Sequence, residues 1–255
     1  MSIWEILSYN LGDNKIMPYG WFHLTFMGLT IAATLILCIF FRNANDKTYR
    51  RIIFIGWIII VVLEIYKQIL YTWYFRHYSW YYFPFQFCST PLYTLPVVAL
   101  CKNEKIRDMF TAFITTFVFL GGFMVMLYPN DVFGDGFVGI GIQTMIHHGS
   151  QIVFGIYLMV YNRKKLSFKH FLSSIPLFAV CCVIAIIINE TMGTNMFFIS
   201  RTINCPLPVL SSIYPLVPWP VFLVIYILGF SLLSFIVYSI AMGITKLTQK
   251  AKKKA

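Results

Sequence analysis

A thiol and two neighbouring imidazoles are the side chains of this sequence best suited to covalent chemistry. Cys88 lies in the stretch FPFQFCSTPLYTLP, and His147 and His148 lie in QTMIHHGSQ. A thiol becomes a competent nucleophile once an imidazole accepts its proton. Counting along the expected helices places the thiol and imidazoles at comparable depth, but this does not establish contact. A disulfide between Cys88 and Cys205 is the structural alternative.

An acidic and a basic residue stand three positions apart in the stretch LEIYKQILY. Glu64 and Lys67 share one face of the expected helix, close enough to pair, and Gln68 continues that side. Charged side chains deep in a membrane are costly, and they often mark function. Two readings stay open: a structural ion pair that joins this helix to a neighbour, or the charged wall of a ligand cavity that binds substrate.

Polar residues form a stripe on the helix expected around the two histidines. Gln143, His147 and Gln151 follow at intervals of four, so they share a face, and His148 lies about 100° around the helix. A polar stripe of this length is typical of a border with water or a polar ligand. The alternative is a hydrogen-bonded packing histidine. Gln151 is therefore a candidate substrate-binding residue alongside the catalytic candidates His147 and His148.

Prolines and loop polar residues mark two further regions. Pro84, Pro91 and Pro96 interrupt the backbone ladder around Cys88, where Gln86 is a candidate for substrate binding. A proline-rich loop at 189–215 carries several polar residues. Among them, Asn195 and Arg201 are candidates for recognising a lipid headgroup. The aromatic residues of the same region are equally well explained as an interfacial belt.

The composition indicates whether these residues lie in a soluble domain or in a membrane. The chain has 255 residues, of which 59% are apolar, 18% aromatic and only 11% charged. Ordinary soluble domains carry about 25% charged residues, so this is an integral membrane protein. The formal charge of +11 is consistent with nucleic-acid binding only if the basic residues form one water-facing patch. They are instead distributed over loops, so we expect no nucleic-acid partner.

We expect an all-α polytopic fold with seven transmembrane helices, because a span needs about 20 mostly apolar residues. The expected spans are 19–41, 52–71, 83–100, 109–127, 137–161, 171–188 and 216–243. Residues 1–18 are expected to be an extracytoplasmic interfacial segment, 19–243 the transmembrane domain and 244–255 a basic cytoplasmic tail.

The distribution of lysine and arginine predicts the orientation. The linkers after the first, third and fifth spans, together with the tail, hold 16 of the 20 basic residues. The opposite side carries Lys15, Arg76 and Arg201. Basic loops stay in the cytoplasm, so the N-terminus is expected outside and the C-terminus inside. The basic surplus is thus a topology signal, with some attraction to anionic phospholipid headgroups.

The order of these motifs resembles a known family. The acid and base of span two, PFQFCSTPLY in span three, HHGSQ in span five and the closing TNMFFISRTINCPLPVLSSIYPLVPWPVF are similar to the YwaF-like family of bacterial seven-helix membrane proteins. The likeness covers most of the chain, and its most specific part runs from Asn195 to Pro220. Met196 stands where the family often has Tyr, and Leu216–Val217 replace the usual Leu–Gly before PWP. The resemblance implies a multi-pass protein of the bacterial plasma membrane.

The family is distantly similar to a eukaryotic acyltransferase that moves fatty acyl chains between phospholipids through a cysteine thioester. That resemblance implies that Cys88 accepts the acyl group, with His147 or His148 as the base. We expect no cofactor and no metal, since the cysteine spacing matches no zinc motif. Gln86, Ser89 or an amide freed by proline would hold the oxyanion. We therefore expect a lipid acyltransferase or acyl-lipid hydrolase with membrane phospholipids as partners.

Three other functions remain open. The first is a transporter or binding protein with no covalent chemistry, although no internal repeat and no Pro-Gln pair typical of sugar-efflux proteins is found. The second is a receptor; a retinal photoreceptor is disfavoured because the last span has no lysine for a Schiff base. The third is a scaffold.

Overall fold

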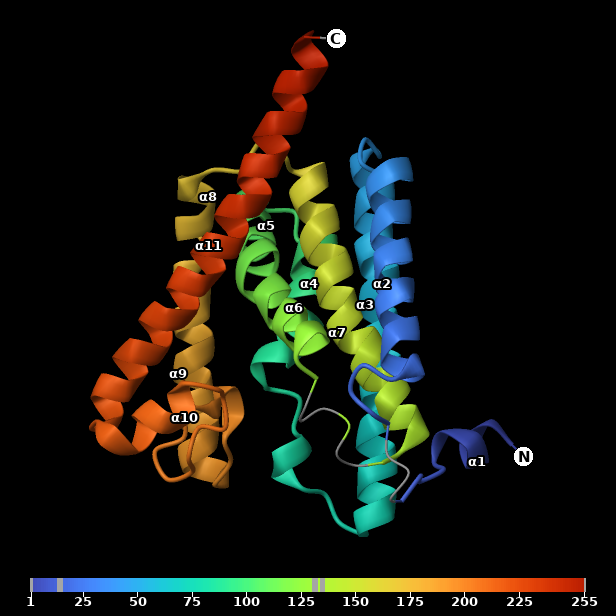
Figure 1. Ribbon diagram of the computed structural model, residues 1–255, viewed down its shortest axis with the longest axis vertical. Helices are drawn as coiled ribbons and strands as arrows, with labels where there is room; N and C mark the ends of the chain where they lie inside the picture. The colour runs from blue at the N-terminus through green and yellow to red at the C-terminus, as the bar shows by residue number, and fades with distance from the viewer. Residues whose placement is uncertain (1, 13–15, 130–132, 134–135, 255) are drawn as a thin grey trace.

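The computed structural model describes residues 2–12, 16–129, 133 and 136–254, and the regular secondary structure of this part is helical apart from one isolated bridge between Asn10 and Phe137. Figure 1 shows a bundle of long helices, with the short helices α1 and α10 toward its lower end and α8 toward its upper end. The α-helices are α1 (Ile3–Leu7), α2 (Trp21–Phe40), α3 (Asp46–Phe75), α4 (Pro91–Leu100), α5 (Glu104–Phe113), α6 (Phe119–Leu127), α7 (Val138–Tyr161), α8 (Phe168–Leu172), α9 (Ile175–Met192), α10 (Leu210–Ile213) and α11 (Trp219–Lys254). The expected all-α class is confirmed for these residues.

Five helical segments in the described ranges are long and apolar enough to cross a membrane. They are Trp21–Phe40, Asp46–Phe75, Glu104–Leu127, Phe168–Met192 and Trp219–Ile244. The protein is therefore a multi-pass membrane protein. Helix α7 has 24 residues but is not one of the five, and its polar stripe lowers its hydropathy. The count of seven spans and their orientation stay predictions.

The expected span 83–100 is wrong in its first part. Only Pro91–Leu100 is α-helix; before it lie the short 3₁₀ turns η1 (Trp80–Tyr82) and η2 (Phe87–Ser89), with non-helical backbone between them. Proline disfavours a helical conformation in the residue that precedes it, and Phe83 before Pro84 is accordingly extended, with ψ 130°. Pro91 is the first residue of α4, a position where its missing backbone donor is tolerated. Cys88 therefore lies in a turn just before a short helix.

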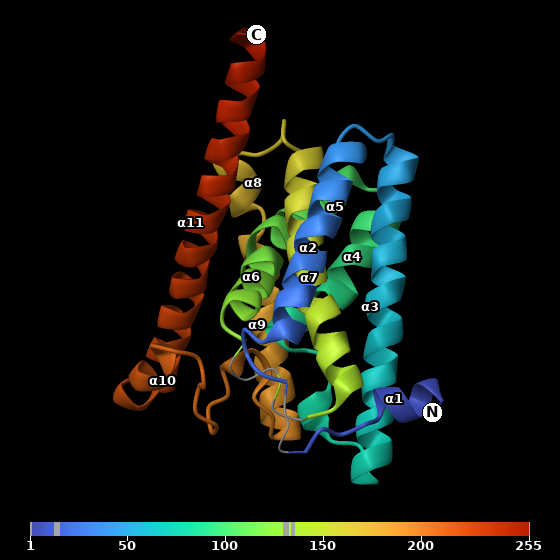
Figure 2. The same cartoon turned by 45° about the vertical axis from the view of Figure 1, so that its right-hand side comes forward.

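Helix α7 lies at the centre of the bundle. Figures 1 and 2 both place it beside α2, and it also packs against α3, α6 and the π-helical segment η3 (Ile114–Val118). Close approach to α6 needs a small residue, because a Cβ on Gly122 would lie 2.7 Å from the backbone oxygen of His148. This packing fixes the polar stripe of α7 inside the protein.

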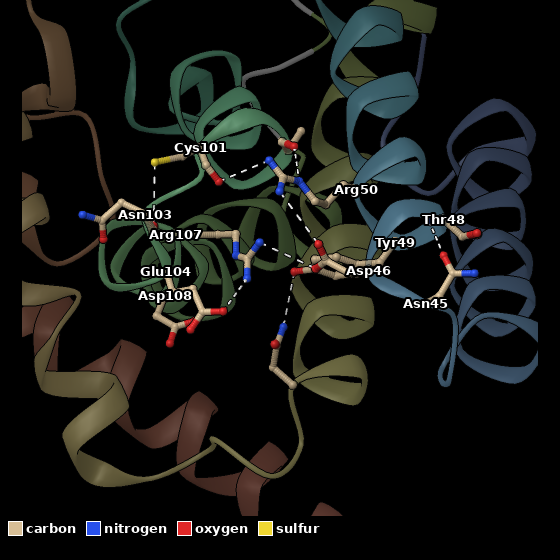
Figure 3. Close-up of polar contacts among 12 residues, drawn as sticks. Asn45, Asp46, Thr48, Tyr49, Arg50, Cys101, Asn103, Glu104, Arg107 and Asp108 are labelled. Carbon is tan, nitrogen blue, oxygen red and sulfur yellow. Dashed lines mark hydrogen bonds and ion pairs between the residues drawn. The ribbon is translucent and has the colours of Figure 1, made fainter.

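A polar network ties three helix ends together where the basic loops meet (Figure 3). Arg50 of α3 donates through Nε to the carbonyl of Ala99, 2.6 Å away, and through Nη2 to that of Cys101. Arg107 of α5 lies 3.6 Å from an Asp46 carboxylate oxygen. These contacts join the start of α3, the end of α4 and the start of α5. We call this end of the bundle the basic end.

The expected interfacial segment 1–18 is partly described, and Lys15 lies outside the described residues. Helix α1 has five residues and packs onto the bundle: the Tyr66 hydroxyl of α3 donates to the carbonyl of Leu7. The amide of Val138 donates to the carbonyl of Tyr9, which ties the segment to the start of α7. At the other end of the chain, α11 continues past residue 243 to Lys254 without a break. Which parts face the cytoplasm stays a prediction.

Candidate functional site

A cavity of about 210 Å³ lies at the end of the bundle opposite the basic end. Its walls come from α3, the interrupted segment 81–89, α7 and one residue after α9. Six of the residues singled out as catalytic or substrate-binding candidates line it together: Glu64, Lys67, Gln86, Cys88, His147 and His148. We call this cavity the polar pocket. The sequence pattern indicated these residues separately, and folding brings them to one place.

The main chain of Cys88 is held by two side chains of α7. Its carbonyl accepts a hydrogen bond from His147 Nε2 and another from Gln151 Nε2, each 2.8 Å long. A carbonyl only accepts, so His147 Nε2 carries a proton, and in the neutral ring Nδ1 is unprotonated. This Nδ1 is buried with no partner among the described residues. The Cys88 residue itself is partly exposed and faces the polar pocket.

His148 has the opposite arrangement. Its Nδ1 lies 2.8 Å from the carbonyl of Thr144 one turn earlier, so Nδ1 is the protonated nitrogen and Nε2 is the acceptor. The residue is buried among α7 neighbours and lines the polar pocket. Both histidines therefore border the cavity. They differ in which ring nitrogen can accept a proton.

The carboxylate of Glu64 is surrounded by donors. Lys67 Nζ lies 2.8 Å from it, Gln68 Nε2 2.6 Å and Gln143 Nε2 of α7 3.4 Å. The Glu64 side chain is 7% exposed and that of Lys67 18%. Gln68 also donates to the carbonyl of Tyr82, so the pair supports the interrupted segment. The ion pair thus has contacts of both kinds considered from the sequence. Glu64 and its neighbours connect α3 to α7 and to the interrupted segment, and Glu64 and Lys67 also line the polar pocket.

Gln86 holds the loop that follows α9. Its Nε2 donates to the carbonyl of Asn195 at 3.2 Å, and its Oε1 accepts from the amide of Phe197 at 3.0 Å. Phe197 and Phe198 both have left-handed φ angles, 57° and 58°, which are unfavourable for bulky residues. The Gln86 amide stabilises this conformation and brings Phe198 to the pocket wall. Its donor is thereby occupied, so it is not free to hold an oxyanion.

Asn195, Arg201 and Gln151 are not among the residues that line the polar pocket. The Asn195 side chain donates to the carbonyl of Asn204 and accepts from the amide of Ser200, so it organises its own loop. Arg201 is exposed on that loop. Gln151 contributes through the Cys88 carbonyl. Headgroup recognition by Asn195 and Arg201 stays a prediction.

Sequence reasoning missed several residues of the pocket wall. Tyr71 lies one turn beyond Lys67 on α3, and Ile140 and Thr144 lie on the polar face of α7. Extending the two helical stripes by one turn would have found Tyr71 and Ile140, and Thr144 lies one turn before His148. Tyr82 and Phe198 also line the pocket, but they lie in irregular segments, where no periodicity indicates which way they face.

All six cysteines are free thiols, so the alternative of a Cys88–Cys205 disulfide is wrong. Cys205 is fully buried in the loop between α9 and α11, and burial raises the pKa of its thiol above the ordinary value. Cys88 is the cysteine that borders a polar cavity. Within the described ranges, no three His, Cys, Asp or Glu side chains are grouped to hold a metal ion.

Comparison with known protein families shows to which family the chain belongs. The sequence model of the TMEM164 family matches residues 18–238, which is most of the sequence. The chain belongs to the TMEM164 family. The TMEM164 match includes Cys88, both histidines and the Glu64–Lys67 pair, and it agrees with the expected kinship to a cysteine-dependent acyltransferase. The narrower YwaF-like assignment stays a prediction. No curated protein and no solved structure matches the chain.

Proposed function

We propose that this TMEM164-family protein is a thiol-dependent lipid acyltransferase in which Cys88 carries the acyl group. The observation that supports the proposal is the meeting of Cys88, His147, His148 and Lys67 in one cavity of a multi-pass membrane protein. A thiol beside a basic imidazole is a competent nucleophile for an ester carbonyl. With the expected orientation, the cavity opens toward the outer leaflet, where phospholipids supply the acyl group.

In the first step the Cys88 sulfur attacks the carbonyl carbon of a phospholipid ester, while His148 Nε2 accepts the thiol proton. The tetrahedral oxyanion is stabilised by hydrogen-bond donors such as the Ser89 hydroxyl, which lines the same cavity. The ester carbon–oxygen bond then breaks. The lysolipid oxygen takes the proton from the imidazolium and leaves, and a thioester remains on Cys88.

In the second step a hydroxyl of the acceptor lipid gives its proton to His148 and attacks the thioester carbon. The carbon–sulfur bond breaks, and the proton returns to sulfur to restore the thiol. His147 acts as a positioning residue, because its Nε2 donates to the Cys88 carbonyl. If water replaces the acceptor, the same steps release a fatty acid, which is acyl-lipid hydrolysis.

Intact mass measurement of the purified full-length protein tests this proposal. We expect a fatty-acyl mass on the wild type and on Cys205→Ser, the matched control, and none on Cys88→Ser. His148→Asn should lower acyl transfer at least about 100-fold, as expected for loss of a general base. His147→Gln keeps an amide donor for the Cys88 carbonyl and should retain most activity. A wild-type protein that never becomes acylated in phospholipid vesicles contradicts the proposal.

One observation favours a second candidate, a lipid or solute binding protein without covalent chemistry. His147 bonds the carbonyl of Cys88 rather than its sulfur, and Glu64 is already satisfied by three donors. A polar pocket of this kind suits noncovalent binding of a headgroup. Solute or lipid movement across vesicles that is unchanged by Cys88→Ser would support this candidate over the acyltransferase.

A further inference from the structure

A second cavity, of about 280 Å³, lies between α2, α3 and α7. We call it the α2–α3–α7 groove; Figure 2 shows α2 in front of α7 with α3 alongside. Its floor includes the buried side chains of Ile60 and Met145. Its lips include Leu29, 56% exposed, and Ile59, 48% exposed. The groove therefore opens on the outer surface of two helices that are candidate membrane spans.

The groove offers no free hydroxyl to an occupant. Two hydroxyl residues line it, Thr30 and Ser150. The Thr30 hydroxyl donates to the carbonyl of Phe26, and the Ser150 hydroxyl donates to that of His147, at 2.8 and 2.7 Å. The remaining lining residues are apolar side chains or glycine. Because a polar occupant would lose its hydrogen bonds here, the groove suits hydrocarbon.

The groove and the polar pocket share no lining residue, but they are lined by adjoining stretches of the same two helices. On α3, Ile60 of the groove lies one turn before Glu64 of the pocket. On α7, Met145 and Gly149 of the groove directly follow Thr144 and His148 of the pocket. The polar pocket alone is smaller than the roughly 300–1,000 Å³ typical of ligand sites. A polar chamber followed by an apolar one matches an amphiphile.

We infer that the α2–α3–α7 groove binds the fatty acyl chain of the lipid whose ester group enters the polar pocket. The inference rests on the proposed function for the ester chemistry, whereas the groove can bind a chain whether or not Cys88 reacts. The bilayer surrounds the lips of the groove, so lipid chains are the hydrocarbon available to it. The occupant is a lipid rather than a protein helix, because a lipid has both an apolar chain for the groove and a polar ester group for the pocket that adjoins it on α3 and α7.

Photo-crosslinking tests the groove independently of catalysis. The full-length protein is placed in phospholipid nanodiscs containing a phosphatidylcholine with a diazirine on one acyl chain, and labelled peptides are mapped. We expect labelling of groove peptides around Ile59 and Met145. Ala33→Phe, which adds a ring to the groove wall, should reduce that labelling at least about fivefold. Ala32→Phe is the matched control, because Ala32 is exposed on the same helix and does not line the groove.

Each outcome decides the inference. Equal groove labelling in Ala33→Phe and Ala32→Phe, or labelling spread evenly over all lipid-facing helices, overturns it. Ala33→Leu gives a smaller obstruction if the phenylalanine variant unfolds, and it should reduce labelling in the same direction. Cys88→Ser should keep full groove labelling. Groove labelling without any acylation of Cys88 would therefore support the groove and contradict the proposed enzyme, whereas acylation with no specific labelling would do the reverse.

Discussion

At the scale of single residues, the polar pocket is defined by hydrogen bonds that leave few side chains free. Glu64 has three donors, the Cys88 carbonyl has two, and Gln86 is paired with the backbone of the 195–197 loop. Three buried atoms at or beside the pocket have no partner among the described residues: His147 Nδ1, Gln68 Oε1 and Gln151 Oε1. A buried polar atom without a partner is costly, so these atoms indicate where water or a ligand atom binds.

The Glu64–Lys67 pair predicts an unequal response to single and double substitution. Lys67→Met removes the cation and leaves a buried carboxylate with amide donors only, so we expect a loss of about 3–5 kcal/mol in unfolding free energy. Glu64→Gln combined with Lys67→Met removes both charges and should recover most of that loss. Thermal unfolding in nanodiscs measures the stability of the wild type, of Lys67→Met and of the double variant.

The Lys165–Asp108 pair provides the control for this comparison. Its side chains are 47% and 38% exposed, so Lys165→Met should change stability by less than about 1 kcal/mol. A double variant at Glu64 and Lys67 that is less stable than Lys67→Met alone would contradict this prediction. In that case an uncompensated carboxylate does not explain the unfolding free energy lost in Lys67→Met.

At the scale of elements, the site depends on the close contact between α6 and α7. Gly122 of α6 faces Gln151 and the backbone of His148, with no room for a Cβ. The π-helical segment η3 precedes α6 directly and is completely buried, so the helix that carries Gly122 cannot shift toward solvent. The position of α7 relative to Cys88 is therefore set by a backbone contact.

Gly122→Ala is expected to destabilise the protein by about 1–3 kcal/mol, because its Cβ would overlap the Cβ of Gln151 at 2.5 Å. The displaced Gln151 should also release the Cys88 carbonyl. Gly229→Ala on α11 is the control, since its Cβ would meet nothing within 4 Å, and it should be neutral or stabilising by up to about 1 kcal/mol. Thermal unfolding and the rate of Cys88 alkylation report the two effects; equal stabilities would refute the packing argument.

The sequence predicted long helices well and interrupted ones poorly. The expected span 109–127 corresponds to a helix that begins earlier, at Glu104, because the Asn103 side chain caps the amides of Lys105 and Ile106. The expected span 52–71 also extends at both ends: the Asn45 side chain caps the amide of Thr48 at the start, and the left-handed Arg76 ends the helix, in stretches that hydropathy does not identify. Around Cys88 the prolines were visible, but the resulting turn geometry was not.

For the candidate site, residue types were predictable and contacts were not. Periodicity identified the faces of α3 and α7 because each lies within one helix. The contact between Gln86 and Asn195 joins residues 109 positions apart, and the carbonyl of Cys88 meets His147 across two elements. Tertiary packing decides such pairs, and local sequence carries no signal for them. The same limit explains why Arg201 was grouped with the site although it is exposed.

At the scale of the whole molecule, the three basic loops do meet at one end. Arg163 donates to the carbonyl of Arg42, and Lys165 pairs with Asp108, so linkers far apart in sequence are neighbours there. The polar pocket and the loops around Gln86 and Asn195 lie at the other end. This segregation of positive charge is the pattern on which the expected orientation rests.

Reporter fusions at the C-terminus test the orientation. We expect a fused green fluorescent protein to be fluorescent and a fused alkaline phosphatase to be inactive in a bacterial host, because the basic end should remain cytoplasmic. Moving the same reporters to the N-terminus should reverse the result if the number of spans is odd. An active phosphatase at the C-terminus would mean that the pocket opens toward the cytoplasmic leaflet.

The length of helix α11 bears on how the whole bundle is positioned in the membrane. Its 36 residues extend about 54 Å, well beyond a hydrocarbon layer of about 30 Å. It begins at Trp219, an aromatic residue that favours the interface, and the sequence places lysines at 246, 250, 252, 253 and 254 toward its other end. Because tryptophan favours the interface and a lysine-rich sequence favours water, this pattern favours one position of α11 along the membrane normal. We therefore expect α11 to set how deeply the rest of the bundle, including Cys88, is immersed in the bilayer.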